Sequence, residues 1–228
     1  MGNKLTAIIL AAGSGTRMGL DVTKQMLLLK GKTVLERTVM AFSECEDVSE
    51  IIVVSRKDEV AQTCAMLSVF PKVSYVVSGG KSRAESAKIG FFYADKSTDY
   101  VAIHDGARCL VTPKTISAVF KDAVKYGAAT ASVAVSDSVK LCEGGVIVEN
   151  IDRDSIRLMQ TPQIFKKSLY ADALLKAESV NEQITDDTSL LTNAGIPVFC
   201  TETGRENIKI TVADDIEYAE FLLTKRGE

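Results

Sequence analysis

A continuous apolar run at Thr6–Leu10 is followed at once by a stretch with almost no side-chain bulk, and this junction constrains the fold most strongly. An uninterrupted apolar run of this length predicts a strand that is covered on both faces, as in α/β proteins. The residues that follow it are small, namely Ala11, Ala12, Gly13, Ser14 and Gly15. Such a backbone approaches a ligand closely and can turn several N–H groups toward phosphate oxygens.

Two cations strengthen the prediction of a phosphate site. Arg17 lies inside the same loop, and Lys24 follows a few residues later. Cations beside a cradle of N–H groups are more typical of a polyphosphate site than of a sugar or lipid site.

Two common glycine-rich motifs do not fit this loop. A dinucleotide-binding fold has the spacing G-x-G-x-x-G, but the spacing from Gly13 to Gly19 is G-x-G-x-x-x-G. The next predicted strand, Glu50–Ser55, also lacks a terminal acid that would hold a ribose. The P-loop motif is absent because Leu20 follows Gly19 where a lysine is required. A simple tight turn with a solvated lysine remains the plain alternative.

Strand-like and helix-like segments alternate along the next hundred residues. Strands are expected at 51–55, 73–77 and 100–104. Helices are expected at 32–43 and 57–67, a third helix should end at 93, and a fourth should follow residue 112. This alternation predicts a Rossmann-like, doubly wound, mostly parallel α/β sheet. Ligands bind beyond the carboxyl ends of such strands, so we expect Arg17, Gly80 and Asp105 to converge there. Further on, the sequence predicts a helix at 167–179, strands at 198–202 and 207–211, and a capping box at Thr211–Asp214 that opens the last helix.

The chain length and composition fit one domain of ordinary α/β size over residues 1–228. The net charge of −3 gives no general attraction to nucleic acid or to an anionic membrane, and no apolar run reaches membrane-spanning length. Five dispersed cysteines argue for a reducing compartment and against structural zinc, so a cytoplasmic location is expected.

Residues 132–153 predict a β-arm. Apolar and polar residues alternate from Ser132 to Leu141, a Gly144-Gly145 turn follows, and a second strand returns. A lone hairpin is marginally stable in water, so we expect this arm to pack against a second copy of the chain.

Three polar residues stand out near predicted strand ends. Asp105 could bind Mg²⁺ or accept a substrate hydroxyl, and the plain alternatives are a helix N-cap or an ion pair with Arg108. Lys209 lies between two isoleucines, where an unpaired ammonium is costly, so it should point at an anion. His104, the one histidine, is expected to be a hydrogen-bonded core residue and not a catalyst.

The motifs together resemble one family over nearly the whole chain. They occur in the order AAGSGTRMG, TKQ, GGKSRAES, HDGAR, DSVK, IDR, TPQ, TDD and NIKIT. This order is similar to that of 2-C-methyl-D-erythritol 4-phosphate cytidylyltransferases. The resemblance implies transfer of CMP from CTP to the methylerythritol phosphate with release of pyrophosphate in non-mevalonate isoprenoid synthesis. For this chemistry we expect Mg²⁺ or another divalent cation as cofactor.

The resemblance also implies residue roles. Arg17 and Lys24 would stabilise charge on the triphosphate, and Arg153 and Lys209 would position the sugar phosphate. Residues near the nucleotide would include Ala11, Ala12, Gly13, Gly15, Gly80, Arg83 and Ser86. Residues near the sugar phosphate would include Asp105, Arg108, Ser138 and Thr185. In this family the arm inserts into the neighbouring subunit, so Ser138 and Arg153 would serve the partner's site in a homodimer.

The sequence departs from the family pattern at three positions. Cys109 stands where proline is usual, Ala87 replaces a valine, and Ser138 replaces a threonine. None of these changes removes a charge, so they bear on the substrate more than on the reaction class. A ribitol 5-phosphate cytidylyltransferase is the nearest competitor. A nicotinamide-dependent reductase and a non-catalytic sugar-nucleotide sensor are the other rivals.

The chemistry needs no general base. A phosphate monoester has a second pKa near 6, so it is largely an anionic nucleophile at neutral pH. Fixed cations and N–H groups that bring two anions together are then the appropriate catalysts.

Overall fold

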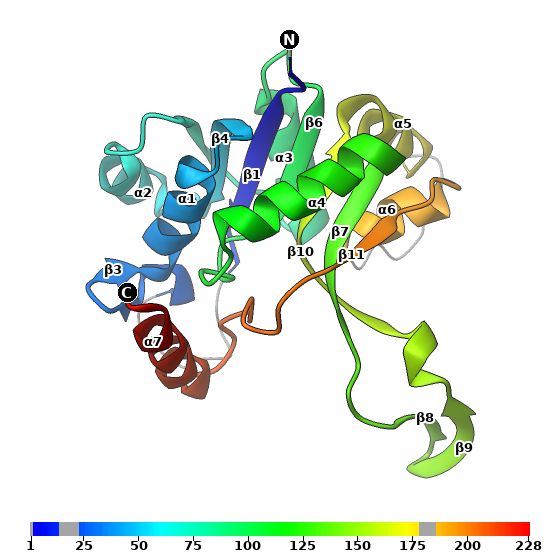
Figure 1. Cartoon of the computed structure of the whole chain (residues 1–228). Coiled ribbons are helices and arrows are strands. Elements are labelled where there is room, and N and C mark those ends of the chain that lie inside the picture. The colour runs from blue at the N-terminus through cyan, green and yellow to red at the C-terminus, as the bar shows by residue number, and fades with distance from the viewer. Residues whose placement is uncertain (1, 14–22, 178–185) are drawn as a thin grey trace.

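The computed structural model describes residues 2–13, 23–177 and 186–228, and its centre is a seven-stranded sheet (Figure 1). In spatial order its strands are β11 (Phe199–Glu202), β7 (Ala128–Ala134), β10 (Arg157–Lys166), β6 (Tyr100–Asp105), β1 (Leu5–Ala11), β4 (Val48–Ser55) and β5 (Val73–Ser78). Strand β1 pairs in parallel with β4 on one side and with β6 on the other. The predicted mostly parallel α/β sheet is therefore confirmed.

Strand β10 runs antiparallel to both of its neighbours, β6 and β7. The connection explains the reversal, because β7 leads out of the sheet and the chain returns beside it as β10, with Arg157 opposite Ala134. The parallel strands β6, β1, β4 and β5 still end together at one edge of the sheet.

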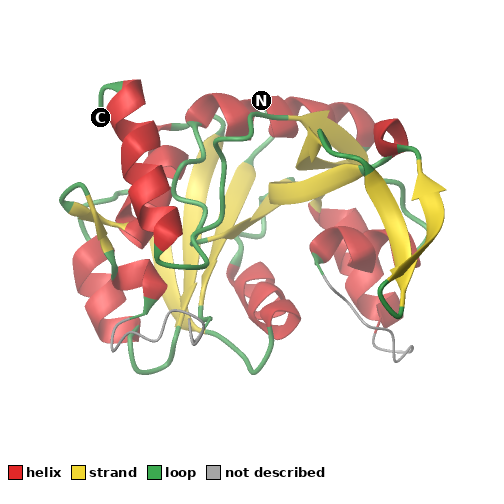
Figure 2. Cartoon of the chain, turned by 90° about the horizontal axis from the view of Figure 1, so that it is seen from below, coloured by secondary structure: helices red, strands yellow, loops and turns green. Residues whose placement is uncertain are grey.

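Helices cover both faces of the sheet (Figures 1 and 2). One face packs on α1 (Val34–Glu44), α2 (Val60–Leu67) and α4 (Pro113–Tyr126). The other packs on α3 (Arg83–Tyr93), α5 (Lys167–Ala177) and α6 (Asp187–Asn193). Successive strand residues point to opposite faces, so Ile9 joins the first core and Ile8 the second, and both are fully buried. This double coverage is why the first strand is apolar throughout.

A smaller layer lies beyond the carboxyl edge of the sheet. It contains a short 3-10 helix η2 (Lys24–Met26), strands β2 (Leu28–Leu29) and β3 (Lys32–Thr33), and helix α7 (Asp214–Arg226). Cys109 is buried in this cluster, and Ala87 is buried beneath β1, so two of the sequence departures are packing positions.

Two expectations for the C-terminal region are wrong. Residues 207–211 form no strand, because their hydrogen bonds go to loop groups, such as the Ala107 carbonyl that accepts from Ile210 N. Helix α7 has no side-chain cap of the predicted kind at its start. Instead the Asp215 carboxylate accepts from the backbone N–H groups of Thr211 and Val212.

The predicted hairpin is present as β8 (Val139–Glu143) and β9 (Val146–Ile151), followed by the 3-10 turn η3 (Arg153–Ser155). Its turn residues Gly144 and Gly145 have φ of 54° and 85°, which glycine tolerates best. The alternating run is split between two strands, because β7 keeps Ser132–Ala134 in the central sheet. The hairpin extends away from the body (Figure 1). No helix in the described ranges is long and apolar enough to cross a membrane.

Candidate active site

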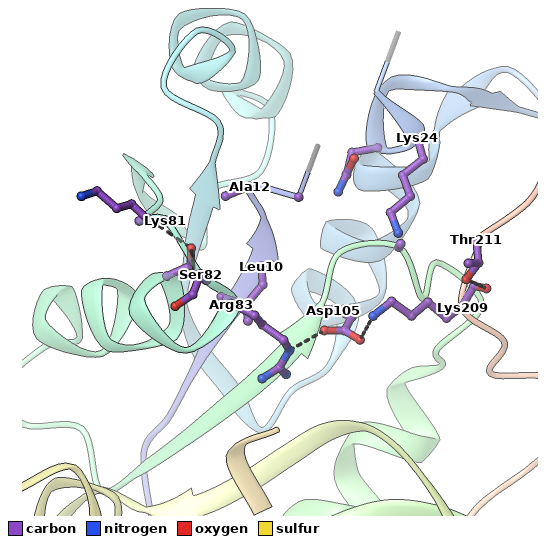
Figure 3. A pocket seen from close by; sticks show the side chains of 14 residues that line it. Leu10, Ala12, Lys24, Lys81, Ser82, Arg83, Asp105, Lys209 and Thr211 are labelled. Carbon is purple, nitrogen blue, oxygen red and sulfur yellow. Dashed lines mark hydrogen bonds and ion pairs between the residues drawn. The ribbon is translucent and has the colours of Figure 1, made fainter. Parts of the chain in front are cut away.

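A cavity of about 440 Å³ lies at the carboxyl edge of the parallel strands (Figure 3). This volume is in the range of small-molecule sites. The described residues that line it are Leu10, Ala12, Gly13, Lys24, Gln25, Gly80, Lys81, Ser82, Arg83, Ser86, Asp105, Ala107, Lys209 and Thr211. Four of them are cations, and Asp105 is the one acid among them. The cavity therefore favours an anionic ligand.

The start of α3 forms one wall. Ser82 caps this helix by accepting from Glu85 N at 3.0 Å, and the Glu85 carboxylate accepts from Lys81 N at 2.7 Å. Ser86 Oγ accepts from Gly80 N at 3.1 Å and donates to the Ser82 carbonyl. These bonds fix the turn before the helix, whose N-terminus attracts anions.

The two glycines of this turn allow a close approach of chain segments. A Cβ on Gly79 would overlap Ala12 at the end of β1, and one on Gly80 would overlap the Glu85 side chain. The first strand and the turn therefore meet at contact distance, which shapes this side of the cavity.

Asp105 lies at the centre of a cluster of cations (Figure 3). Its carboxylate contacts Arg83 Nε at 3.2 Å and Lys209 Nζ at 2.8 Å. Burial alone would raise the pKa of Asp105, but the charges of Arg83 and Lys209 outweigh burial and hold the pKa well below its usual range. The carboxylate is thus ionised at neutral pH, and it is the anion at which Lys209 points.

The loop that carries Lys209 is fixed by buried polar contacts. Arg108 Nη1 donates to the Asn207 carbonyl at 2.9 Å, while its Nε lies 3.9 Å from Asp105. Asn207 in turn donates to the Thr161 carbonyl at 2.8 Å. Arg108 does not line the cavity but holds the segment that does, and its ion pair with Asp105 is longer than those of Arg83 and Lys209.

Arg83 has a second, more buried partner that the sequence did not reveal. Its Nη1 lies 2.6 Å from Asp187, whose other oxygen accepts from Tyr170 OH at 2.7 Å. Asp187 is only 2% exposed, and its backbone N–H donates to Gln163. Burial lowers the pKa of Arg83, but the charges of Asp187 and Asp105 outweigh burial and raise the pKa overall. The one sequence signal for Asp187 is its place in the TDD motif.

His104 is the predicted core residue. Its ring is fully buried, with Nδ1 3.0 Å from Thr161 Oγ1 and Nε2 3.3 Å from the Arg108 carbonyl. Burial lowers the pKa of His104 to about 3. The imidazole is therefore neutral at physiological pH, and it links β6 to β10.

The donor set does not fit a metal held by Asp105 alone. Both carboxylate oxygens already pair with cations, and the described residues contain no group of three or more His, Cys, Asp or Glu side chains suited to an ion. A divalent ion on this carboxylate would compete with Arg83 and Lys209 for its charge. The arrangement of Asp105 suits the orientation of cations better than the binding of a metal.

The predicted site residues fall into three groups. Those that line the cavity are Ala12, Gly13, Lys24, Gly80, Arg83, Ser86, Asp105 and Lys209. Those placed elsewhere are Ala11, which is buried in the core, Arg108, and the arm-region residues Ser138 and Arg153. Gly15, Arg17 and Thr185 lie outside the described residues.

Arg153 lies at the base of the arm and not among the lining residues. Its guanidinium is half exposed and donates to the Ser136 carbonyl at 2.8 Å. The arm therefore presents a cation to its surroundings on an element that projects from the body (Figure 1).

Known proteins are similar to this chain in sequence and fold. The family model described as IspD: 2-C-methyl-D-erythritol 4-phosphate cytidylyltransferase matches residues 5–225. The chain is 39% identical over 225 residues to the 2-C-methyl-D-erythritol 4-phosphate cytidylyltransferase of Clostridium acetobutylicum, with 97% of this chain and 98% of that protein covered. It is 36% identical to the bifunctional enzyme IspD/IspF of Desulfotalea psychrophila, where the match covers 97% of this chain and spans 57% of that protein's length.

Solved structures agree. The crystal structure of 4-diphosphocytidyl-2C-methyl-D-erythritol synthase from Anaerococcus prevotii matches with a TM-score of 0.87 and 29% identity, covering 97% of this chain and 96% of that one. From the sequence motifs, the fold and these relatives together, the chain belongs to the 2-C-methyl-D-erythritol 4-phosphate cytidylyltransferase family.

Proposed function

We propose that this protein transfers CMP from CTP to 2-C-methyl-D-erythritol 4-phosphate and releases pyrophosphate, a step of isoprenoid synthesis. The observation that carries the proposal is the cavity at the sheet edge, which four cations and one carboxylate line in a chain of this family. Such a site suits two phosphate groups that must be brought together.

The proposed step is a displacement at phosphorus. An oxygen of the substrate's phosphate attacks the α-phosphorus of CTP, and the bond from that phosphorus to the pyrophosphate oxygen breaks. Since the monoester is already largely deprotonated at neutral pH, no side chain has to accept a proton. The neutral, buried imidazole of His104 agrees with this requirement.

The residues of the cavity then act through position and charge. Lys24 stabilises the triphosphate as charge develops on the leaving group, as fixed cations do in phosphoryl transfer. Lys209 binds the attacking phosphate, and Asp105 holds the ammonium in place before the substrate arrives. Asp105 then accepts hydroxyl groups of the polyol, because carboxylate oxygens accept hydrogen bonds.

A divalent cation, such as Mg²⁺, is proposed to enter with the triphosphate and not to reside on Asp105. Mg²⁺ commonly binds through substrate phosphates with one or two carboxylates at most. When bound, it supplies positive charge to the triphosphate.

We further propose a homodimer in which each arm reaches the neighbour's cavity. The arm exposes Leu141, Val146, Ile147 and Val148, each between 47% and 65%. An exposed apolar hairpin is marginal alone and gains stability from a covering surface. Arm exchange would bring Ser138 and Arg153, which lie away from their own cavity, to the partner's substrate.

The dimer is tested by sedimentation of Ile147→Lys. This change should raise the monomer fraction, whereas Val69→Lys, at a residue that is 74% exposed on the body, should not. Equal dimer fractions for wild type and Ile147→Lys would reject the arm as the interface.

The reaction is tested by pyrophosphate release. CTP, UTP, ATP and GTP are each combined with methylerythritol phosphate and with ribitol 5-phosphate. Release with CTP and methylerythritol phosphate is expected. Release that depends on ribitol 5-phosphate would replace the proposed substrate, and CTP binding without any release would reject catalysis.

A further inference from the structure

Gln25 lines the cavity, and among the described residues its buried side-chain amide has no hydrogen-bond partner. Only 2% of the residue is exposed, and Oε1 is fully buried and unpaired. In the part of the chain that the structure describes, neither end of this amide makes a hydrogen bond. Buried side-chain amides ordinarily find partners, so this one requires an explanation.

A second buried glutamine shows the usual behaviour. Gln163 is 1% exposed, its Nε2 donates to Asp186 at 2.8 Å, and its Oε1 accepts from Asp187 N at 3.1 Å. Both ends of that amide stabilise the fold. Within the described residues Gln25 makes no comparable contribution: its Oε1 stays unpaired, and its Nε2 is left as the donor that a cavity ligand could use.

The position of Gln25 indicates what its amide could contact. The Nε2 atom lies 3.9 Å from the point where a Cβ of Gly13 would stand, and Gly13 lines the cavity. Lys24, the neighbouring residue, also lines it. The amide donor thus shares the space of a strand-end glycine and a cation, where an anion with acceptor oxygens would lie.

We propose that Gln25 is a nucleotide-binding residue whose Nε2 donates to a phosphate oxygen of CTP, and this assignment rests on the proposed function. A deprotonated phosphate only accepts hydrogen bonds, so it suits an NH₂ group. A neutral donor beside Lys24 fixes the direction of the phosphate, which a rotating ammonium does less well.

Gln25→Met separates binding from stability, because methionine is close in shape but cannot donate. Calorimetry should show CTP binding weakened roughly tenfold to a hundredfold, the usual effect of losing a hydrogen bond to a charged group. Binding of cytidine should be unchanged. The urea midpoint of the free protein should stay equal or rise, because an unpaired buried oxygen has been removed. Gln163→Met, the matched control, should lower the midpoint.

Gln25→Glu provides a second variant of the same size. Its carboxylate would repel the phosphates, so the loss of CTP affinity should exceed that of Gln25→Met, again without loss for cytidine. If Gln25→Met lost affinity for CTP and for cytidine equally, the phosphate contact would be overturned. It would also be overturned if the urea midpoint of Gln25→Met fell as much as that of Gln163→Met. Unchanged CTP binding in Gln25→Met would overturn the assignment alone, whereas no CTP binding by the wild type would overturn the proposed function as well.

Discussion

Asp187→Asn should weaken both the fold and the nucleotide site, because the Asp187 carboxylate holds Arg83 from the buried side. The carboxylate is 2.6 Å from Arg83 Nη1 and accepts from Tyr170 OH at 2.7 Å. Asparagine keeps an oxygen for Tyr170 but removes the negative charge.

The magnitude follows from burial and from the partners that remain. Breaking a buried ion pair by removing one partner costs about 3–5 kcal/mol. Arg83 is still 29% exposed and keeps its contact with Asp105, so part of the charge stays compensated. We therefore expect Asp187→Asn to lower the free energy of unfolding by about 2 kcal/mol, which is below that range. Asp187→Ala also leaves the buried Tyr170 hydroxyl without its acceptor, which adds about 1–3 kcal/mol.

Urea unfolding of wild type, Asp187→Asn, Asp187→Ala and Tyr170→Phe measures these differences. The double variant Tyr170→Phe/Asp187→Ala should be less destabilised than the sum of its singles, since they share one hydrogen bond. If Asp187→Asn lowered the free energy of unfolding by less than about 0.5 kcal/mol, the ion pair between Arg83 and Asp187 would behave like an exposed surface pair. That result would refute the reasoning.

Four further predictions concern the cavity, the core and the arm. Lys24→Ala should lower kcat by about two orders of magnitude or more, and near-normal turnover in a folded variant would remove Lys24 from the mechanism. Lys209→Ala should mainly raise KM for the polyol phosphate in assays saturated with CTP; an unchanged KM would reject its role. His104 resists protonation in the fold, with a pKa of about 3. Stability should therefore fall as pH drops below about 6.5, by roughly 1.4 kcal/mol per pH unit, and urea unfolding of His104→Asn should show a flatter pH dependence. Lys24→Ala and Arg153→Ala can be mixed in equal amounts at a polyol phosphate concentration so low that Arg153→Ala alone shows little turnover. The mixture should then reach about a quarter of wild-type activity, because each mixed dimer with exchanged arms has one intact site; no recovery would contradict exchange.

Local patterns predicted much of the fold because they report local burial and local caps. The apolar run at Thr6–Leu10 lies on β1, between its parallel neighbours β6 and β4, and His104 is the buried residue that its position indicated. The helix expected after residue 112 is α4, where Thr112 caps the start by accepting from Thr115 N and Pro113 occupies the first turn. Each of these features depends on residues close in sequence.

Features set by distant contacts were not predictable from such patterns. The alternating residues at 207–211 resemble a strand, yet the segment is held by Ala107 and Arg108 from another part of the chain. The reversed direction of β10 follows from the return of the arm. Asp187 acquires its role only where α6 brings it to Arg83, which lies 104 positions away.

The central claim is that fixed cations join two phosphates without proton abstraction by a side chain. The dependence of kcat/KM on pH, measured with methylerythritol phosphate at saturating CTP, tests it most directly. We predict a single rise whose midpoint equals the second pKa of the free substrate phosphate, near 6 and measurable by phosphorus NMR. A further rise at higher pH, matching no ionisation of CTP or substrate, would reveal a general base and contradict the account.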